Sequence, residues 1–273
     1  MKKILIAFDN GNFSEGAFEM ARRLNEMEPV HLVGFFLPAV HYANEPIGAE
    51  VVAQPYYIPL MEEEDFNVIE DSIIKFEEKC SENNIHYSLH KDLIDAAIPS
   101  LKIETRFSDL LIIGSEMFYK NLGKEKINPY LKYAMHEVEC PVLIVPEKFQ
   151  FPTSNILAYD GDETSVFAIK QFKLFLPELC KHKTMLLYAS EKNAEIPDLS
   201  YIEEYAAISF PGFETCEVNF DAKKYFATWI SEKKGAILIT GSFGRSEFSE
   251  FFRHSFVSEV ITEHYIPVFI AHK

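Results

Sequence analysis

Two glycines and a later serine mark the part of this sequence best suited to bind an anion. Gly241 and Gly244 follow a run of apolar residues, and Ser255 lies at the predicted start of a later helix. Glycines let the backbone approach a phosphate closely and direct N–H groups toward it. Ser255 is suited either to cap its helix or to bond a phosphate oxygen. Without a ligand, the same residues would only form a strand-to-helix turn and a helix cap.

Several enzyme motifs are absent from the sequence. It contains no G-x-x-x-x-G-K-[ST] loop, no G-x-G-x-x-G and no G-x-S-x-G elbow. Asp9 and Asp160 end apolar runs as the acids of receiver domains do. Receiver domains also need a cluster of acids for Mg²⁺ and a lysine after a late strand, but Gly114 and Gly241 stand where those signals should begin. The cysteines have no C-x-x-C spacing, and His86 and His90 fall in a predicted strand. We therefore predict no metal site and assign no catalytic residue.

The bulk composition limits the class of protein. Hydrophobic residues make up 48% of the 273 residues, enough for packed cores. The formal net charge of −16 opposes general binding to nucleic acid or to an anionic membrane. No apolar run is long enough for a signal peptide core or a membrane span. Cys80 and Cys140 lie in apolar patterns typical of buried thiols in a reducing compartment. We expect a cytoplasmic protein.

An internal repeat organises the elements that must position the glycines. The offset that takes Asp9 to Asp160 also takes Ser14 to Ser165, and each half opens with a buried strand and an amphipathic helix. The halves also close alike. Residues 109–115 resemble residues 236–242, and residues 140–145 resemble residues 266–271. We predict two domains, 1–147 and 154–273, joined by a short linker that Pro146 and Pro152 flank.

Apolar strands alternate with helices throughout the first half. We predict strands over 3–8, 30–36, 86–89, 110–113 and 142–145, and helices over 14–27, 62–83, 96–107 and 126–138. A loop over 37–60 is long enough to be a lid or an interface arm. The second half repeats the pattern with a reduced second helix over 199–206. Such alternation predicts parallel sheets covered on both faces, with ligands at the carboxyl ends of the strands.

These features resemble the universal stress proteins across the whole chain. The shared features are a strand ending in Asp, a late strand entering Gly-Ser, and a last strand of the Cys140-Pro-Val-Leu-Ile-Val type. The resemblance implies two tandem Rossmann-like α/β domains. Each would contain a five-stranded parallel sheet in the order 3-2-1-4-5 with helices on both faces. Many members bind ATP through G-x-x-G, nine residues and G-[ST], whereas others lack the motif and do not.

The second half is close to that nucleotide motif. Gly241-Ser242-Phe243-Gly244 is followed by nine residues and then by His254-Ser255, so a histidine replaces the third glycine. His254 could fill the phosphate space, face outward, or contact phosphate when protonated. The resemblance places Arg245 near a phosphate. It places the ends of the first and second strands of this half near the adenosine. The predicted nucleotide-binding residues are Asp160, Leu187, Tyr188, Gly241, Ser242, Gly244, Arg245, His254, Ser255 and the covering Phe256.

The first half departs further from the motif. Gly114-Ser115-Glu116-Met117 lacks the second glycine, and Glu116 adds negative charge on the phosphate side. We expect this half to be structural. Family members commonly pair through the last strand, so the resemblance implies that Val142–Val145 and Val268–Ala271 pair within one chain as an intrachain pseudo-dimer. The sequence leaves open whether two chains then form a homodimer.

Three functional hypotheses follow. In the first, ATP with Mg²⁺ binds the second half and changes contacts with an unidentified protein partner in a stress response. In the second, the protein is a stress-response scaffold that binds no nucleotide. In the third, it is a slow ATPase, although no residue is placed as general base because Asp160 is expected at the adenosine end.

Overall fold

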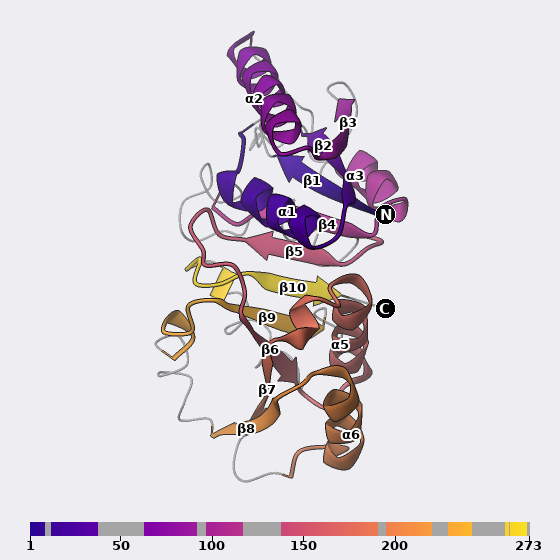
Figure 1. The fold of residues 1–273 in the computed structure, drawn as a ribbon, viewed down its shortest axis with the longest axis vertical. Helices are drawn as coiled ribbons and strands as arrows, with labels where there is room; N and C mark the ends of the chain where they lie inside the picture. The colour runs from indigo at the N-terminus through magenta and orange to yellow at the C-terminus, as the bar shows by residue number, and fades with distance from the viewer. Residues whose placement is uncertain are drawn as a thin grey trace, which may run out of the picture.

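Strands and helices alternate along the chain (Figure 1). The computed structural model describes residues 1–8, 12–37, 63–91, 97–116, 138–190, 195–219, 229–241, 260–261 and 263–271. The first half contains β1 Lys2–Phe8, α1 Glu15–Met27, β2 Val30–Phe36, α2 Glu63–Glu82, β3 His86–Lys91, α3 Ala97–Arg106, β4 Leu110–Gly114 and β5 Val142–Val145. The second half contains β6 Ser154–Tyr159, α5 Glu163–Phe175, η3 Leu179–Lys181, β7 Lys183–Ser190, α6 Leu199–Ser209, β8 Phe213–Asn219, β9 Ala236–Gly241 and β10 Val268–Ala271.

The predicted elements of the first half lie where the sequence pattern placed them. β2 and β5 match their predicted ranges, and the other strands and helices differ by one or two residues at their ends. The helix predicted over 62–83 is α2, which buries Ile69, Ile73, Phe76 and Cys80. The loop over 38–60 and the helix predicted over 126–138 fall outside the described residues, apart from Val138.

All ten strands form one sheet in the order β3-β2-β1-β4-β5-β10-β9-β6-β7-β8. Within each half the strands are parallel and follow the expected order 3-2-1-4-5, and the two five-stranded sheets are continuous with each other. β5 and β10 pair antiparallel, with Leu143 opposite Phe269, as expected for the last strand of each half. This pairing joins the two sheets in the middle of the molecule (Figure 1).

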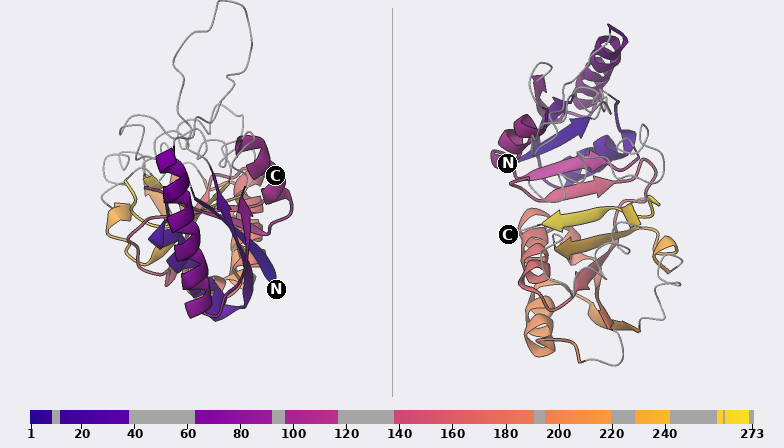
Figure 2. Two further views of the ribbon diagram at one scale, coloured as in Figure 1. Left: turned by 90° about the horizontal axis from the view of Figure 1, so that it is seen from above. Right: turned by 180° about the vertical axis from the view of Figure 1, so that it is seen from behind.

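Both faces of the sheet are covered. Alternate residues of each strand belong to two hydrophobic clusters, so Ile4 and Ile6 of β1 face one side and Leu5 and Ala7 the other. The first cluster includes apolar residues of α1, α2, α5 and α6, and the second includes Leu101 of α3 and Ile230. Figure 2 shows the sheet from above and from behind. This burial on both faces explains why the strands are apolar throughout.

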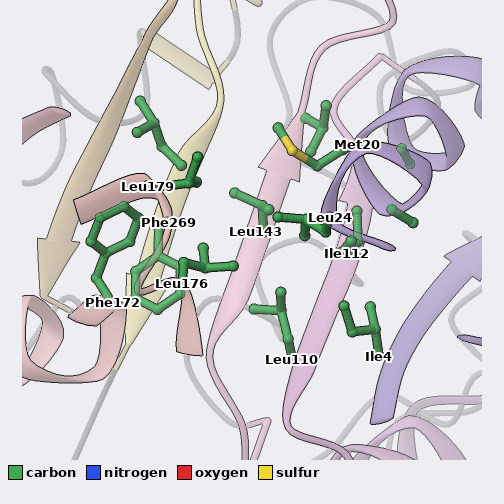
Figure 3. Close-up of a cluster of buried hydrophobic side chains, with 14 of the residues drawn as sticks. Ile4, Met20, Leu24, Leu110, Ile112, Leu143, Phe172, Leu176, Leu179 and Phe269 are labelled. Carbon is green, nitrogen blue, oxygen red and sulfur yellow. The ribbon is translucent and has the colours of Figure 1, made fainter. Parts of the chain in front are cut away.

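The core runs without a break from one half into the other. Figure 3 shows Leu143 of β5 between Leu24 of α1 and the second-half residues Leu176 and Phe269. Phe269 is fully buried, and its ring lies 5.3 Å from that of Phe172 in an edge-on arrangement. The two halves therefore share apolar contacts on the face covered by α1 and α5, in addition to the strand pairing.

The cysteines of the core are inert thiols. Cys80, Cys140 and Cys180 are buried, and burial raises the pKa of each thiol to about 12. All four cysteines are free, which agrees with the expectation that Cys80 and Cys140 pack as small apolar residues. In the described ranges, no helix combines the length and hydropathy that crossing a bilayer would require.

Candidate functional site at the carboxyl edge of the second half

The winding direction of the second half reverses at β6. β6 pairs in parallel with β7 on one side and with β9 on the other. The chain therefore runs from β6 through β7 to β8 on one side and then crosses to β9 and β10 on the other. Ligands of such sheets bind in the crevice between strand carboxyl ends at this reversal. Asp160 directly follows β6, and Gly241 is the last residue of β9. Two of the predicted site residues thus lie on either side of the expected crevice.

Asp160 is held in a tight turn. Its Oδ1 accepts a hydrogen bond from the backbone N–H of Asp162 at 2.9 Å, and Gly161 between them has φ +84°. Asp162 then caps α5, because its Oδ1 accepts from the N–H of Thr164 at 3.1 Å. The turn fixes the Asp160 side chain at the strand end while leaving it partly exposed.

Gly241 is required by packing alone. A Cβ atom at this position would lie 2.6 Å from the Thr164 carbonyl carbon and 2.8 Å from the Ser165 nitrogen. The end of β9 therefore lies against the first turn of α5. This contact explains the glycine without a ligand, and it brings the start of the predicted phosphate loop beside the amino end of a helix, where anions are favoured.

The two residues predicted at the end of the second strand have different surroundings. The Leu187 side chain is 1% exposed and packs in the cluster on the α3 side of the sheet. Only its backbone could face a ligand. The Tyr188 side chain points to the opposite face, where its ring lies 6.5 Å from that of Tyr159. Because adjacent strand residues alternate between faces, one side chain of the pair had to enter the core.

Tyr159 connects the strand end to the segment before α6. Its hydroxyl donates to the carbonyl oxygen of Pro197 at 2.8 Å. The Pro197 ring covers Gly161, where an added Cβ would lie 2.8 Å from the ring. Burial raises the pKa of Tyr159, and the nearby carboxylates of Asp198 and Asp160 raise it further. The sequence interpretation missed Pro197, because only the fold brings it over residue 161.

The rest of the predicted site lies outside the described residues: Ser242, Gly244, Arg245, His254, Ser255 and Phe256. Their roles stay predictions. Across the described ranges, no three histidine, cysteine or acidic side chains converge in a way that could hold a metal ion.

The equivalent edge of the first half is occupied by its own side chains. The Glu147 carboxylate accepts from the backbone N–H of Gly16 at 3.1 Å, and Ser14 Oγ accepts from the N–H of Ala17 at 3.2 Å. These bonds satisfy donors at the amino end of α1 that an anion would otherwise use. Gly114 packs against the Ser14 side chain, whereas Gly241 packs against the backbone of Thr164 and Ser165.

A second carboxylate lies beside that helix end. Glu116 Oε2 accepts from the Ser115 hydroxyl at 2.9 Å and from the backbone N–H of Glu147 at 2.8 Å. Ser115 Oγ also lies 2.7 Å from Nδ1 of His264, on the loop before β10. The Glu116 carboxylate, which was expected to add negative charge here, thus accepts hydrogen bonds from the protein itself. His264 and Glu147 were missed by the sequence interpretation, since their positions depend on the β5–β10 pairing and on the chain direction after β5.

Comparisons with known proteins agree with this geometry at the level of fold. No protein-family model and no curated protein matches the sequence. A universal stress protein from Archaeoglobus fulgidus DSM 4304 superposes with a TM-score of 0.69 and 14% identity, over 100% of this chain and 96% of its own. This chain has the universal stress protein fold. The fold class expected from the sequence is confirmed.

Two further solved structures are similar to this chain over its whole length. A putative universal stress protein from Pseudomonas aeruginosa UCBPP-PA14 has a TM-score of 0.57 and 14% identity, over 100% of this chain and 93% of its own. A protein of unknown function from Pseudomonas aeruginosa PAO1 has the same TM-score and identity, over 100% of this chain and 92% of its own. The similarity therefore spans both halves.

Proposed function

We propose that this chain is a tandem universal stress protein that works as a nucleotide-responsive binding module in the cytoplasm. In this proposal, the second half binds ATP with Mg²⁺ and the bound nucleotide changes contacts with a protein partner. The first half supports the sheet and binds no nucleotide.

The asymmetry between the two carboxyl edges carries the proposal. In the second half, Asp160 and Gly241 flank the crevice where β6 reverses the winding direction, and the glycine pair continues from β9. In the first half, the carboxylates of Glu116 and Glu147 accept hydrogen bonds from backbone N–H groups at the equivalent edge. A ligand phosphate there would meet like charge and donors already in use.

Calorimetry with ATP and Mg²⁺ tests this function. We expect binding heat for the native chain and none for Gly244→Trp, because an indole would fill the space reserved for the phosphates. His254→Gly should bind ATP more tightly, since it restores the third glycine of the motif. Ile208→Trp is the matched control, because it adds the same side chain at a position on α6 that is 77% exposed.

Two results would reject the proposed pocket or the nucleotide. Heat that survives Gly244→Trp would place ATP elsewhere. No heat with the native chain or with His254→Gly would favour the scaffold hypothesis, in which the protein acts only through its surfaces. Phosphate release measured in the same samples separates binding from slow hydrolysis.

A further inference from the structure

The second half contains an open groove between α5 and α6. The groove encloses about 750 Å³. Its floor is Tyr159, one wall is the Val166, Phe167 and Lys170 face of α5, and the other is the Tyr201, Ile202 and Tyr205 face of α6. Gly161, Glu163 and Asp198 complete the lining at the carboxyl edge of the sheet. Three tyrosines and a phenylalanine therefore surround a space of the size that small-molecule sites have.

The same space in the first half is closed by aromatic side chains. Phe8 and Phe36, which correspond in strand position to Tyr159 and Tyr188, stack with their rings 4.9 Å apart. Phe76 of α2 packs edge-on against both rings, and Phe13 stacks on Phe8 at 5.2 Å. The first-half arrangement is an ordinary closed core.

Two sequence differences open the second copy. α6 has 11 residues and no phenylalanine, whereas α2 has 20 residues and supplies Phe76. Tyrosines replace the two strand-end phenylalanines, and their rings are 6.5 Å apart and tilted rather than stacked. The tyrosine hydroxyls bring polar groups to two strand-end positions that are occupied by phenylalanine in the other copy. The space beside the first two strands is therefore filled by aromatic rings in the first half and open in the second.

The charges at the groove favour a cation. Glu163 and Asp198 line the carboxyl-edge end, and the Asp160 and Asp198 carboxylates act on Tyr159. Lys170 is the opposing charge, and its ammonium group lies 5.8 Å from the centroid of the Tyr205 ring. Lys173, on the next turn, donates to Ser209 and lies 5.4 Å from the same ring. Aromatic faces and carboxylates together attract organic cations.

Asp198 adds a backbone feature to this end of the groove. It precedes α6 with φ +49° and ψ 30°, and its side chain makes no capping hydrogen bond to that helix. A non-glycine residue in the left-handed region is uncommon, and such residues cluster at ligand sites. The turn places an exposed carboxylate at the groove rather than on the helix end that it could cap.

We infer that the α5–α6 groove binds a small organic cation with a planar aromatic body. The aromatic body would lie among Tyr201, Tyr205 and Phe167, with its ammonium group toward Asp198 and Glu163. The groove adjoins the proposed nucleotide site at Gly161 and Glu163, but none of the described residues predicted to bind the nucleotide is in its lining, and its walls are the facing sides of α5 and α6.

Tryptamine and indole-3-propionate test the inference as a pair of probes with one aromatic body and opposite charges. Calorimetry and ligand-observed NMR should show that tryptamine binds more tightly than indole-3-propionate. Tyr201→Ala should weaken tryptamine binding about two- to ten-fold, the range of one aromatic contact. Asp198→Asn should weaken it about two- to five-fold, as for an exposed ion pair, and asparagine tolerates the left-handed backbone.

The variants are chosen so that folding is not at issue. Tyr201 is 74% exposed, so its removal leaves the core intact, and Ile208→Ala on the same helix is a matched control that should change nothing. Equal binding of the two probes, or tryptamine binding that Tyr201→Ala leaves unchanged, would overturn the inference. Sedimentation showing a dimer that Tyr201→Ala dissociates would also overturn it, since a second copy would then be the occupant.

The nucleotide experiment gives an independent check. Tryptamine binding should persist in Gly244→Trp whether or not that variant loses ATP. Loss of both ligands in this variant would assign the probe to the nucleotide pocket and would overturn a separate groove site. Loss of ATP alone, or of neither ligand, supports it.

Discussion

At the scale of residues, one glycine in each half occupies the same position of the repeat. Gly114 and Gly241 end equivalent strands, and each lies against the amino end of the first helix of its own half. The neighbours differ, because Gly114 faces the Ser14 side chain whereas Gly241 faces the backbone of Thr164 and Ser165. A side chain can move aside more easily than a helix backbone can.

This difference predicts two outcomes for the same substitution. Gly241→Ala should destabilise the protein by about 1–3 kcal/mol or more, because β9 or α5 must shift to admit the methyl group. Gly114→Ala should also be destabilising, but Ser14→Gly should largely restore stability in the double variant, since glycine at a helix cap costs only a few tenths of a kcal/mol. Urea unfolding of the three variants measures this. A double variant no more stable than Gly114→Ala would contradict the assigned contact.

The sequence predicted part of the candidate site at this scale. Asp160 and Gly241 follow from the ends of apolar runs, which a local pattern reveals. Strand alternation shows that the side chains of Leu187 and Tyr188 face opposite sides of the sheet, but not which of the two faces the ligand. The structure places the Leu187 side chain in the core. Pro197, Glu147 and His264 depend on contacts between distant segments, and no spacing in the sequence marks them.

Helices α1 and α2 show how elements of the first half are held together. Glu15 of α1 bridges to α2 through Lys75 at 2.6 Å and Lys79 at 3.0 Å. Partial burial raises the pKa of Glu15, but the hydrogen bonds and charges of the two lysines outweigh it and lower the pKa overall. A carboxyl with a lowered pKa in the folded state stabilises the protein above its unfolded pKa of about 4.3 and loses this effect as the pH falls through the folded value.

Glu15→Gln should therefore destabilise the protein at pH 7 and have a smaller effect near pH 3. The groups are half-exposed, so we expect a loss of up to about 1 kcal/mol at pH 7. Urea midpoints at both pH values measure it. Glu78→Gln is the matched control, because Glu78 is an exposed residue of α2 with no ion pair to a described residue. An equal loss at both pH values would assign the effect to packing rather than charge.

Elements were the level at which sequence prediction worked best. Apolar runs and helical spacing are local, and they placed the described strands and helices of the first half. Helix starts were harder. Ser165 is equivalent to the capping residue Ser14, yet α5 is capped by Asp162 and begins at Glu163. The Ser165 hydroxyl instead donates to the Asp162 carbonyl oxygen, so one repeat position has two roles.

The whole molecule is built around the antiparallel pairing of β5 and β10. The two hydrophobic clusters each include residues of both halves, so neither half has a core that ends at the boundary. Phe269 lies at this joint, opposite Leu143 and against Phe172. The halves should therefore unfold together.

Phe269→Ala tests this shared core. We expect a loss of about 3–5 kcal/mol and faster hydrogen exchange in β4 and β5 as well as in β9. Phe210→Ala is the control, because Phe210 is equally buried but lies at the end of α6, away from the joint. Its effect on exchange should be confined to the second half. Faster exchange limited to the second half in Phe269→Ala would show that the two cores are independent.

The central pairing also limits how copies of this chain can associate. β5 and β10 each have a neighbour on both sides, so no second chain can add to either strand. Among the described strands, only β3 and β8 end the sheet. Both carry charged or titratable side chains, such as His86 on β3 and Glu214 on β8, which disfavour edge-to-edge growth. Any self-association would therefore have to use surfaces other than β5 and β10, so the last strands are no guide to subunit number.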